Sequence, residues 1–436
     1  MKLSTVEPEV SAATDRPRLL PRLYLVPPVS RPRRTLSPRI GYAVAALVVG
    51  LGLFASVTPS PLYRSYSVLW HFSPLTLTLI YATYAFGVLA TLVFAGAVSD
   101  VVGRRPVLLA ALAGLMGSTA LFLVADSAAW LFVARGLQGV ATGATLSAAS
   151  AALLDLHPRR DAARVGLTNA APAAIGIGLG MLVSSSLVQL GWEPRRLPFV
   201  VLLGLIAIAL AGAYRMPEPV ADRRPFRLTV ERPHVPAAVR RPFVLAALAV
   251  LSSWSIGALF FSLGPQLAGQ LFATTNVIVS GIGIVALAAA ATAAQFLTGR
   301  TPPWIAASVG SIALAAGMLM IVAAASVDSS GLYLAGSILG GAGFGAAFLG
   351  GLRALVAAIP PEHRAAIMSA FFVVAYGSLS VPAILAGVSV TYISLQSTFE
   401  IFGSVVAAIA LVVAFEAWRS RPDRRTLRSV PEPARS

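Results

Sequence analysis

The stretch Gly96–Pro106 reads GAVSDVVGRRP and separates two long apolar segments of the chain. Its glycine, acidic and basic residues follow one spacing, G-x-x-x-D-x-x-G-R-R, and are Gly96, Asp100, Gly103, Arg104 and Arg105. The two glycines permit a tight turn and close helix contact. The aspartate can pair with an arginine or with the positive end of a helix. Two arginines between apolar segments favour a loop on the cytoplasmic side of a membrane.

The composition excludes an ordinary soluble protein. The chain has 436 residues, of which 57% are hydrophobic and 11% charged, and its mean hydropathy is +0.80. A soluble domain carries about 25% charged residues. The formal net charge is +16, and a positive net charge is also expected of nucleic-acid-binding proteins. Here, however, the basic residues lie in tails and loops around apolar segments. We therefore expect a lipid bilayer, and not a nucleic acid, as the partner of this chain.

Apolar segments long enough to cross a bilayer need about 20 residues, and twelve such segments are predicted. They are Ile40–Val57, Leu75–Val98, Pro106–Val124, Ala129–Leu154, Val165–Leu190, Leu197–Ala213, Phe243–Leu263, Val277–Leu297, Ile305–Ala325, Leu332–Ala358, Ala365–Val388 and Phe399–Trp418. The prediction is an all-α membrane protein with five regions. These are a disordered basic tail (1–39), a first six-helix half (40–213), a linker (214–242), a second half (243–418) and a basic tail (419–436).

The distribution of lysine and arginine predicts the orientation. With both termini inside, 28 of the 33 basic residues fall in cytoplasmic segments and only Arg64, Arg195 and Arg196 lie outside. Basic loops stay on the cytoplasmic side, so we expect a multi-pass protein of the cytoplasmic (inner) cell membrane with both termini cytoplasmic. The first 38 residues show no pattern of a cleaved signal peptide.

The two halves carry related loop sequences. Gly103–Pro106, GRRP, has a counterpart in Gly299–Pro302, GRTP, and Phe296 stands where Asp100 would be. The first loop resembles the signature loop of the major facilitator superfamily of secondary transporters. That resemblance implies twelve helices in two six-helix halves that rock around a central substrate site. It also implies a gating role for the first loop. Asp155 lies at the cytoplasmic end of the fourth segment, close in topology to Arg104, so we expect a charge cluster of Asp100, Arg104 and Asp155. The alternative for Asp155 is a solvated carboxylate.

Arg135 is the clearest charge inside an apolar segment of the first half. It lies in ARGLQGVATGA, with Gln138 and Thr142 on the same helical face. A charge within hydrocarbon costs about 2.5–3.5 kcal/mol, so such a residue usually faces a cavity or a partner. The stretch resembles the fourth-helix arginine motif that is linked to proton transfer in drug:proton antiporters. The alternative is that Arg135 only bonds carbonyl groups and fixes helix packing.

Two proline-containing stretches are expected to bend helices. Pro59 and Pro61 end the first segment, in TPSPLY, which resembles the outer end of helix one in some drug exporters. Pro172 and Gly176 lie in the fifth segment, which resembles the antiporter motif G-P-x-x-G-G, although Ala171 replaces its first glycine. An ordinary turn and an ordinary membrane helix are the respective alternatives.

A mostly apolar cavity between the halves is predicted, and it suits lipophilic or amphipathic compounds better than sugars. The residues expected to line it are Tyr81, Tyr84, Arg135, Gln138, Thr142, Asn169, Trp254, Gln266, Phe372 and Tyr376. No acidic residue falls in the middle of an expected span, and no nucleotide-binding loop or metal-ligand spacing occurs in the sequence. We expect no cofactor, no metal and no enzymatic activity.

The resemblance implies a monomeric secondary active transporter of the multidrug efflux branch, an antiporter that exchanges a small molecule for protons across the cell membrane. An importer or exporter of a small metabolite, such as a sugar or an organic acid, is the alternative on the same fold. A polytopic membrane enzyme or a membrane sensor is the alternative from another class.

Overall fold

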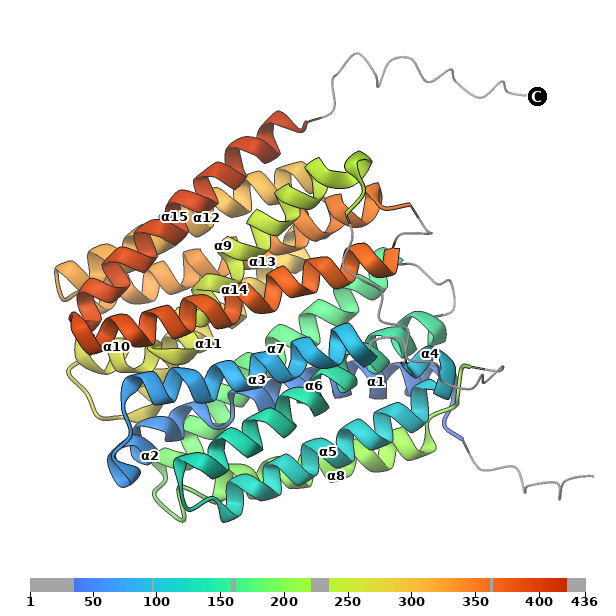
Figure 1. Cartoon of the computed structure of the whole chain (residues 1–436), viewed down its shortest axis with the longest axis horizontal. Helices are drawn as coiled ribbons and strands as arrows, with labels where there is room; N and C mark the ends of the chain where they lie inside the picture. Colours follow the sequence, from blue (N-terminus) through green and yellow to red (C-terminus); the bar gives the residue numbers. More distant parts are fainter. Residues whose placement is uncertain (1–34, 96–97, 158–161, 221–234, 361–363, 422–436) are drawn as a thin grey trace, which may run out of the picture. The chain divides into compact units, whose positions relative to one another are not determined.

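The computed structural model describes residues 35–95, 98–157, 162–220, 235–360 and 364–421, and the predicted site residue Gly96 lies outside these ranges. Two units are distinguished, Met1–Thr35 and Leu36–Ser436, and the helices described below lie in the second. Within the described ranges the regular structure is entirely helical (Figure 1). The prediction of an all-α membrane protein with twelve spans is confirmed, because twelve helices are long and apolar enough to cross a membrane.

The first half of the chain forms eight α-helices and one short 3₁₀-helix. They are α1 (Pro38–Val57), η1 (Ser60–Leu62), α2 (Tyr63–Trp70), α3 (Pro74–Ala95), α4 (Val98–Val102), α5 (Arg104–Val124), α6 (Ala128–Leu156), α7 (Ala162–Gln189) and α8 (Leu197–Arg215). The second half forms η2 (Ala237–Val239), α9 (Arg240–Ser262), α10 (Gly264–Leu271), α11 (Val277–Thr298), α12 (Pro303–Ser326), α13 (Ser330–Ala358), α14 (Arg364–Tyr392) and α15 (Leu395–Arg419).

The packing of helices repeats between the halves. In the first half α1 packs on α7, α3 and α5 pack on α6, and α5 packs on α8. In the second half the corresponding pairs are α9 with α14, α11 and α12 with α13, and α12 with α15. Equal pairings at equal places in the chain are expected of two related bundles.

The two halves meet along two equivalent helix pairs, α3 with α14 and α7 with α11. Figure 1 shows α3 and α14 side by side. Thr78, near the start of α3, leaves no room for a Cβ at Gly387 of α14. The backbone N–H of Val277 at the start of α11 donates to Gln189 Oε1 at the end of α7 (2.8 Å). These contacts join the halves at one end of the bundle, which we call the Gln189 face.

The opposite end of the first half is called the Arg104 face. Here α1 begins beside the end of α8, as the hydrogen bond from the backbone N–H of Leu36 to the carbonyl of Arg215 (2.8 Å) shows. The loop between α3 and α5 lies at the same end. In Figure 1 the ribbons of α3 and α14 separate toward α4, which lies at this face.

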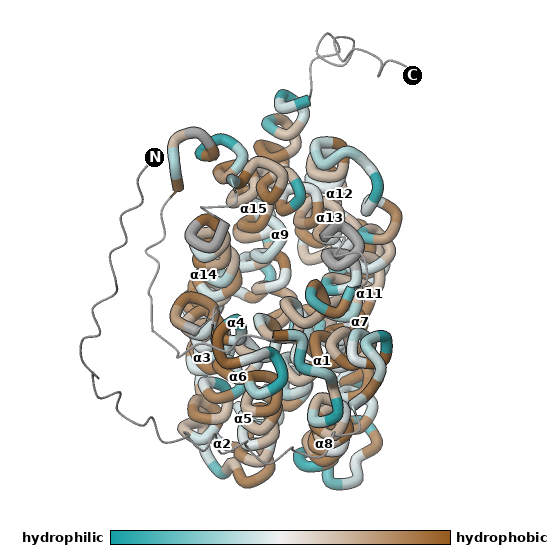
Figure 2. The backbone as a smooth tube through the Cα atoms, turned by 90° about the vertical axis from the view of Figure 1, so that its right-hand side faces the viewer, coloured by the Kyte–Doolittle hydropathy of each residue, from teal (hydrophilic) through white to brown (hydrophobic). Residues whose placement is uncertain are grey.

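Residues of high hydropathy recur throughout the helices, as the colouring of the backbone in Figure 2 shows. Many large ones are exposed, for example Phe86, Val133, Ile208 and Leu411. In water such surfaces favour association, whereas in a bilayer they contact lipid tails. The exposed apolar residues therefore agree with membrane embedding.

The helices α1 and α7 cross where small residues face each other. A Cβ at Gly176 of α7 would collide with the Gly50 backbone of α1, and a Cβ at Gly50 would lie 2.9 Å from the carbonyl oxygen of Pro172. The helix α7 is assigned as one continuous helix through Pro172. Membrane helices commonly approach closely at such positions. Gly176, predicted as a bending residue, is thus placed at a close helix contact.

We expect Gly176→Ala to destabilise the fold, because overpacking costs about 1–3 kcal/mol. The matched control is Gly204→Ala in α8, where the new Cβ meets nothing within 4 Å. The measurement is the thermal unfolding midpoint of the purified chain in detergent. The midpoint should fall for Gly176→Ala and should stay or rise for Gly204→Ala, and equal midpoints would contradict the close contact.

Candidate functional site

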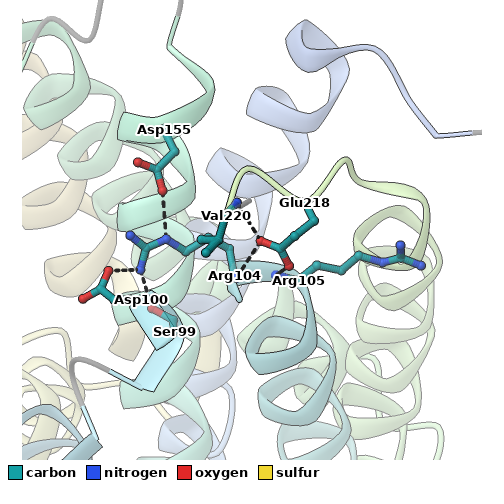
Figure 3. A network of polar contacts seen from close by, with 7 residues as sticks. All are labelled: Ser99, Asp100, Arg104, Arg105, Asp155, Glu218 and Val220. Atoms are coloured by element: carbon teal, nitrogen blue, oxygen red, sulfur yellow. Dashed lines mark hydrogen bonds and ion pairs between the residues drawn. The ribbon is translucent and has the colours of Figure 1, made fainter. Parts of the chain in front are cut away.

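Arg104 is the centre of a polar cluster at the Arg104 face, shown in Figure 3. Its Nε donates to Asp155 Oδ2 (2.9 Å) and its Nη1 donates to Ser99 Oγ (2.7 Å). Nη1 also forms an ion pair with Asp100. The Arg104 side chain is 11% exposed, whereas that of Asp100 is 57% exposed. The structure brings together the three residues predicted to form a charge cluster, and all of these partners belong to the first half.

Glu218 holds the start of α5 from the segment that follows α8. Its two carboxylate oxygens accept the backbone N–H groups of Arg104 (2.9 Å) and Arg105 (3.0 Å). The first N–H groups of a helix have no partner within the helix and favour a negative charge. Gly103, which precedes α5, has no side chain to supply that acceptor. Glu218 therefore caps α5 and connects the loop to the end of α8.

Gly103 is required here for two reasons. Its φ of +112° lies in a region that residues with a Cβ rarely adopt. A Cβ at this position would also lie 2.7 Å from Glu218 Oε2. The neighbouring Arg105 places its guanidinium over the ring of Tyr214, at 5.0 Å from the centroid. Glu218 and Tyr214 were not among the predicted site residues.

The second half stabilises the matching loop differently. Arg353 of α13 donates through Nη1 to the carbonyls of Thr298 (3.3 Å) and Thr301 (2.9 Å). The first of these carbonyls ends α11 and the second follows it, and a cation is favourable at the end of a helix. The cation that bonds these carbonyls thus comes from α13, and within the loop the Thr301 hydroxyl also donates to the Thr298 carbonyl (2.9 Å).

Arg135 lies at the junction of α1, α2 and α6 and has no exposed surface. Its Nε donates to the Tyr63 hydroxyl (2.5 Å), and its Nη1 donates to the Ser56 carbonyl (2.7 Å) and to Gln138 Oε1 (2.5 Å). Gln138 Nε2 in turn donates to the Ala55 carbonyl (2.9 Å). Arg135 and Gln138, which were expected to share a helical face, therefore both donate hydrogen bonds to carbonyls in the last turn of α1.

The prolines at the end of α1 explain why carbonyls are available there. Pro59 has no N–H, so the Ala55 carbonyl lacks its usual donor four residues on. The helix ends at Val57, so the carbonyls at its end have no donor from a following turn, except that of Phe54, which accepts the Thr58 N–H. Side chains of other helices replace the missing donors, including Ser184 of α7, whose Oγ donates to the Thr58 carbonyl (2.6 Å). Pro61 lies inside η1, where the chain turns into α2.

Three tyrosine rings surround the Arg135 guanidinium. The distances from Cζ to the ring centroids are 5.4 Å for Tyr63, 5.8 Å for Tyr81 and 5.3 Å for Tyr84. Aromatic rings at this range attract a cation. Within the described ranges no carboxylate forms a salt bridge with Arg135, and its Nη2 has no hydrogen-bond partner. The positive charge is therefore held by hydroxyl, amide and carbonyl oxygens and by aromatic faces.

The other predicted cavity residues lie in three places. Thr142 is buried one turn beyond Gln138 in α6. Trp254, Phe372 and Tyr376 form an aromatic cluster that also packs against Tyr81 and Tyr84 across the α3/α14 contact. Asn169 lies apart from it in α7, where its Oδ1 accepts a hydrogen bond from Ser150 Oγ (2.8 Å).

A cavity of about 600 Å³ lies between the halves near the Gln189 face. Of the predicted cavity residues it is lined only by Gln266, and of the predicted bending residues only by Pro61. Tyr63, whose hydroxyl holds Arg135, also lines it. Tyr63 was not predicted as a site residue, although its place two residues after Pro61 was visible in the sequence.

The family model described as Major Facilitator Superfamily matches residues 40–381. The chain belongs to the major facilitator superfamily. A similar solved structure is the crystal structure of the human organic anion transporter MFSD10 (TETRAN), with a TM-score of 0.64 and 18% sequence identity over 87% of this chain and 99% of that chain. At this identity the likeness concerns the fold.

Membership of the superfamily makes the protein a multi-pass membrane protein with a transporter fold, and it favours a transporter over an enzyme. Three features of this chain bear on its mechanism. They are the polar cluster around Arg104, the buried Arg135 with its surrounding tyrosines, and the two interfaces between the halves, α3/α14 and α7/α11.

Proposed function

We propose that this protein is a secondary active transporter that exports small lipophilic or amphipathic molecules across the cytoplasmic membrane by alternating access, in exchange for protons. The observation that supports this most is the equivalence of the two interfaces between the halves. A pair of related bundles joined by α3/α14 and α7/α11 can rock about these contacts and expose a central site to either side. We expect the working unit to be a monomer.

The orientation proposed for this cycle places the Arg104 face in the cytoplasm. The basic residues of the loops favour it. Since the contacts between halves described above lie toward the Gln189 face or in the middle of the bundle, the structure corresponds in this proposal to a state closed toward the outside.

The orientation is tested by cysteine labelling, for which a chain without cysteine is well suited. Single cysteines at Arg300 and at Thr391 are expected to behave oppositely in intact cells. An impermeant maleimide should label the residue at 391 and should reach the residue at 300 only after the membrane is permeabilised. Labelling of the cysteine at 300 in intact cells would contradict the orientation.

The transport activity is tested with the purified chain in proteoliposomes. The probes are ethidium as a lipophilic cation, naphthalene-2-sulfonate as an amphipathic anion, and glucose and citrate as polar metabolites. We expect flux of an amphipathic probe above that of protein-free liposomes, accelerated by an imposed pH gradient. Flux that is indifferent to the pH gradient would contradict proton exchange, and flux of glucose or citrate alone would favour the metabolite transporter.

A second candidate, transport of a small organic anion on the same fold, is favoured by the charge of the Arg135 site. The described spans hold acidic residues only near their ends, namely Asp155, Glu400 and Glu416, and Arg135 has an unused N–H donor group at Nη2. Such a site prefers an acceptor or a negative charge. The similar human protein is named an organic anion transporter. Faster flux of naphthalene-2-sulfonate than of ethidium would favour this candidate.

A further inference from the structure

The cavity at the Gln189 face combines an apolar wall with two cationic side chains. Both halves supply the apolar wall, for example Leu62, Leu77 and Met181 from the first and Phe261 and Val277 from the second. Its volume of about 600 Å³ falls within the range of small-molecule sites. The cavity therefore has the size and the surface to accept a compound with an apolar body.

The charges that line this cavity all have one sign. Arg64 and Arg195 contribute to the lining, and no acidic residue does. The nearby Glu193 forms its ion pair with Arg196 (3.6 Å), which does not line the cavity. Neither Arg64 nor Arg195 has a carboxylate within salt-bridge distance in the described part of the chain. Two uncompensated cations beside low-dielectric walls create a positive potential that attracts anions.

The guanidinium of Arg64 reaches across the cavity toward the second half. Its Nη1 lies 4.0 Å from the position that a Cβ on Gly269 of α10 would occupy. Arg195 comes from the segment between α7 and α8. The two cations thus border the same cavity from different elements of the first half, α2 and the α7–α8 segment.

A buried hydroxyl at the wall adds an unused polar group. Ser60 of η1 lines the cavity and is 6% exposed, and its Oγ has no hydrogen-bond partner among the described residues. A buried hydroxyl without a partner costs free energy, and a bound polar group removes that cost. Next to it, Tyr63 lines the cavity and accepts the hydrogen bond of Arg135.

We propose that this cavity is a binding site for an amphipathic anion, with the negative group between Arg64 and Arg195 and the apolar body against the wall of both halves. The ligand chemistry is a sulfonate, carboxylate or phosphate on an apolar body, and its source is either a soluble organic anion or an anionic lipid. Binding at this site does not require that the protein transports the ligand, so the affinity is measured on the purified chain at equilibrium.

The test uses two probes of similar shape and opposite charge, naphthalene-2-sulfonate and 2-naphthylmethyl-trimethylammonium. Their affinities are measured by equilibrium dialysis against the full chain in phosphatidylcholine nanodiscs, with empty nanodiscs as the background. We expect the sulfonate to bind about tenfold more tightly than the ammonium probe, because each of the two arginines attracts the sulfonate and repels the ammonium group. Equal affinities would overturn the proposal.

The variants Arg64→Gln and Arg195→Gln should each weaken sulfonate binding by about 2–5-fold, and the double variant by the product of the two. The matched control is Arg196→Gln, which removes the neighbouring arginine that is paired with Glu193 and does not line the cavity. Both cavity arginines are exposed, so their replacement leaves the fold intact. A double variant with the affinity of the unmodified chain would overturn the proposal.

Nanodiscs with phosphatidylglycerol distinguish the two sources of the ligand. If an anionic lipid occupies the site, this lipid should weaken sulfonate binding to the unmodified chain, and the effect should disappear in the double glutamine variant. If the ligand is a soluble anion, phosphatidylglycerol should leave sulfonate affinity unchanged. Either result supports the site, whereas competition that is equal in the unmodified chain and the double variant would contradict it.

Discussion

Replacement of Arg135 by alanine is expected to reduce transport by at least about tenfold, and replacement by lysine nearly as much. The guanidinium bonds the Tyr63 hydroxyl, the Ser56 carbonyl and Gln138 through two nitrogens of one planar group. A single ammonium cannot present the same directions. Each buried group that loses its partner costs about 1–3 kcal/mol, and 1.4 kcal/mol corresponds to a factor of ten. The measurement is flux in proteoliposomes that contain equal amounts of folded protein.

The matched control is Arg353→Lys in the second half. Arg353 reaches its two carbonyls through a single nitrogen, Nη1, so a lysine ammonium can replace it with little loss. If Arg135→Lys transports at the unmodified rate, only the charge of Arg135 matters and its geometry does not. If Arg135→Ala also transports at the unmodified rate, Arg135 has no role in the transport cycle.

Asp100→Asn is expected to slow transport by about tenfold while leaving the stability of the fold nearly unchanged. The carboxylate of Asp100 is more than half exposed, and an exposed ion pair contributes at most about 1 kcal/mol. In the structure it binds Arg104 within the first half. We propose that the same charges hold the two halves together at the Arg104 face when the site opens outward, so their loss shifts the population toward the inward-open state.

The comparison variant is Asp155→Asn. The Asp155 side chain is 25% exposed and its Oδ2 accepts the hydrogen bond of Arg104 Nε. Because Arg104 is itself nearly buried, the loss of this partner should lower the thermal midpoint more than Asp100→Asn does. Unchanged flux in Asp100→Asn, at normal amounts of protein in the membrane, would rule out the gating role.

The all-helical fold with twelve spans was predictable because each apolar segment is long enough to cross a bilayer and the basic loops separate the segments. The short helices α2 and α10 were not predicted. Pro61 lies in the first positions of η1, which leads into α2, and α10 has Pro265 in its first turn. A proline is tolerated where a helix begins, because the N–H that it lacks would have no partner there. Prolines near the ends of the predicted spans are therefore compatible with the start of a further short helix.

The sequence singled out Arg104 and Arg135 but not all of their partners. Asp100 was predicted beside Arg104 from the loop pattern, and Asp155 from its place at the cytoplasmic end of the fourth segment. Glu218 was not, because it acts on backbone N–H groups more than one hundred residues away. Tyr63 was overlooked because a tyrosine at the end of a span is usually an interface residue. Contacts of this kind depend on helix crossings that no local pattern encodes.

The most direct test of alternating access measures distances between the halves on both faces by double electron–electron resonance. One spin-labelled pair spans the Arg104 face, at positions Arg215 and Arg300, and another pair spans the Gln189 face, at Leu190 and Thr391, all of them exposed in the structure. We predict two distance populations for each pair. When the pH is changed or an amphipathic probe is added, the share of the longer distance should rise on one face and fall on the other. A single unshifted distance on both faces under all conditions would contradict the account.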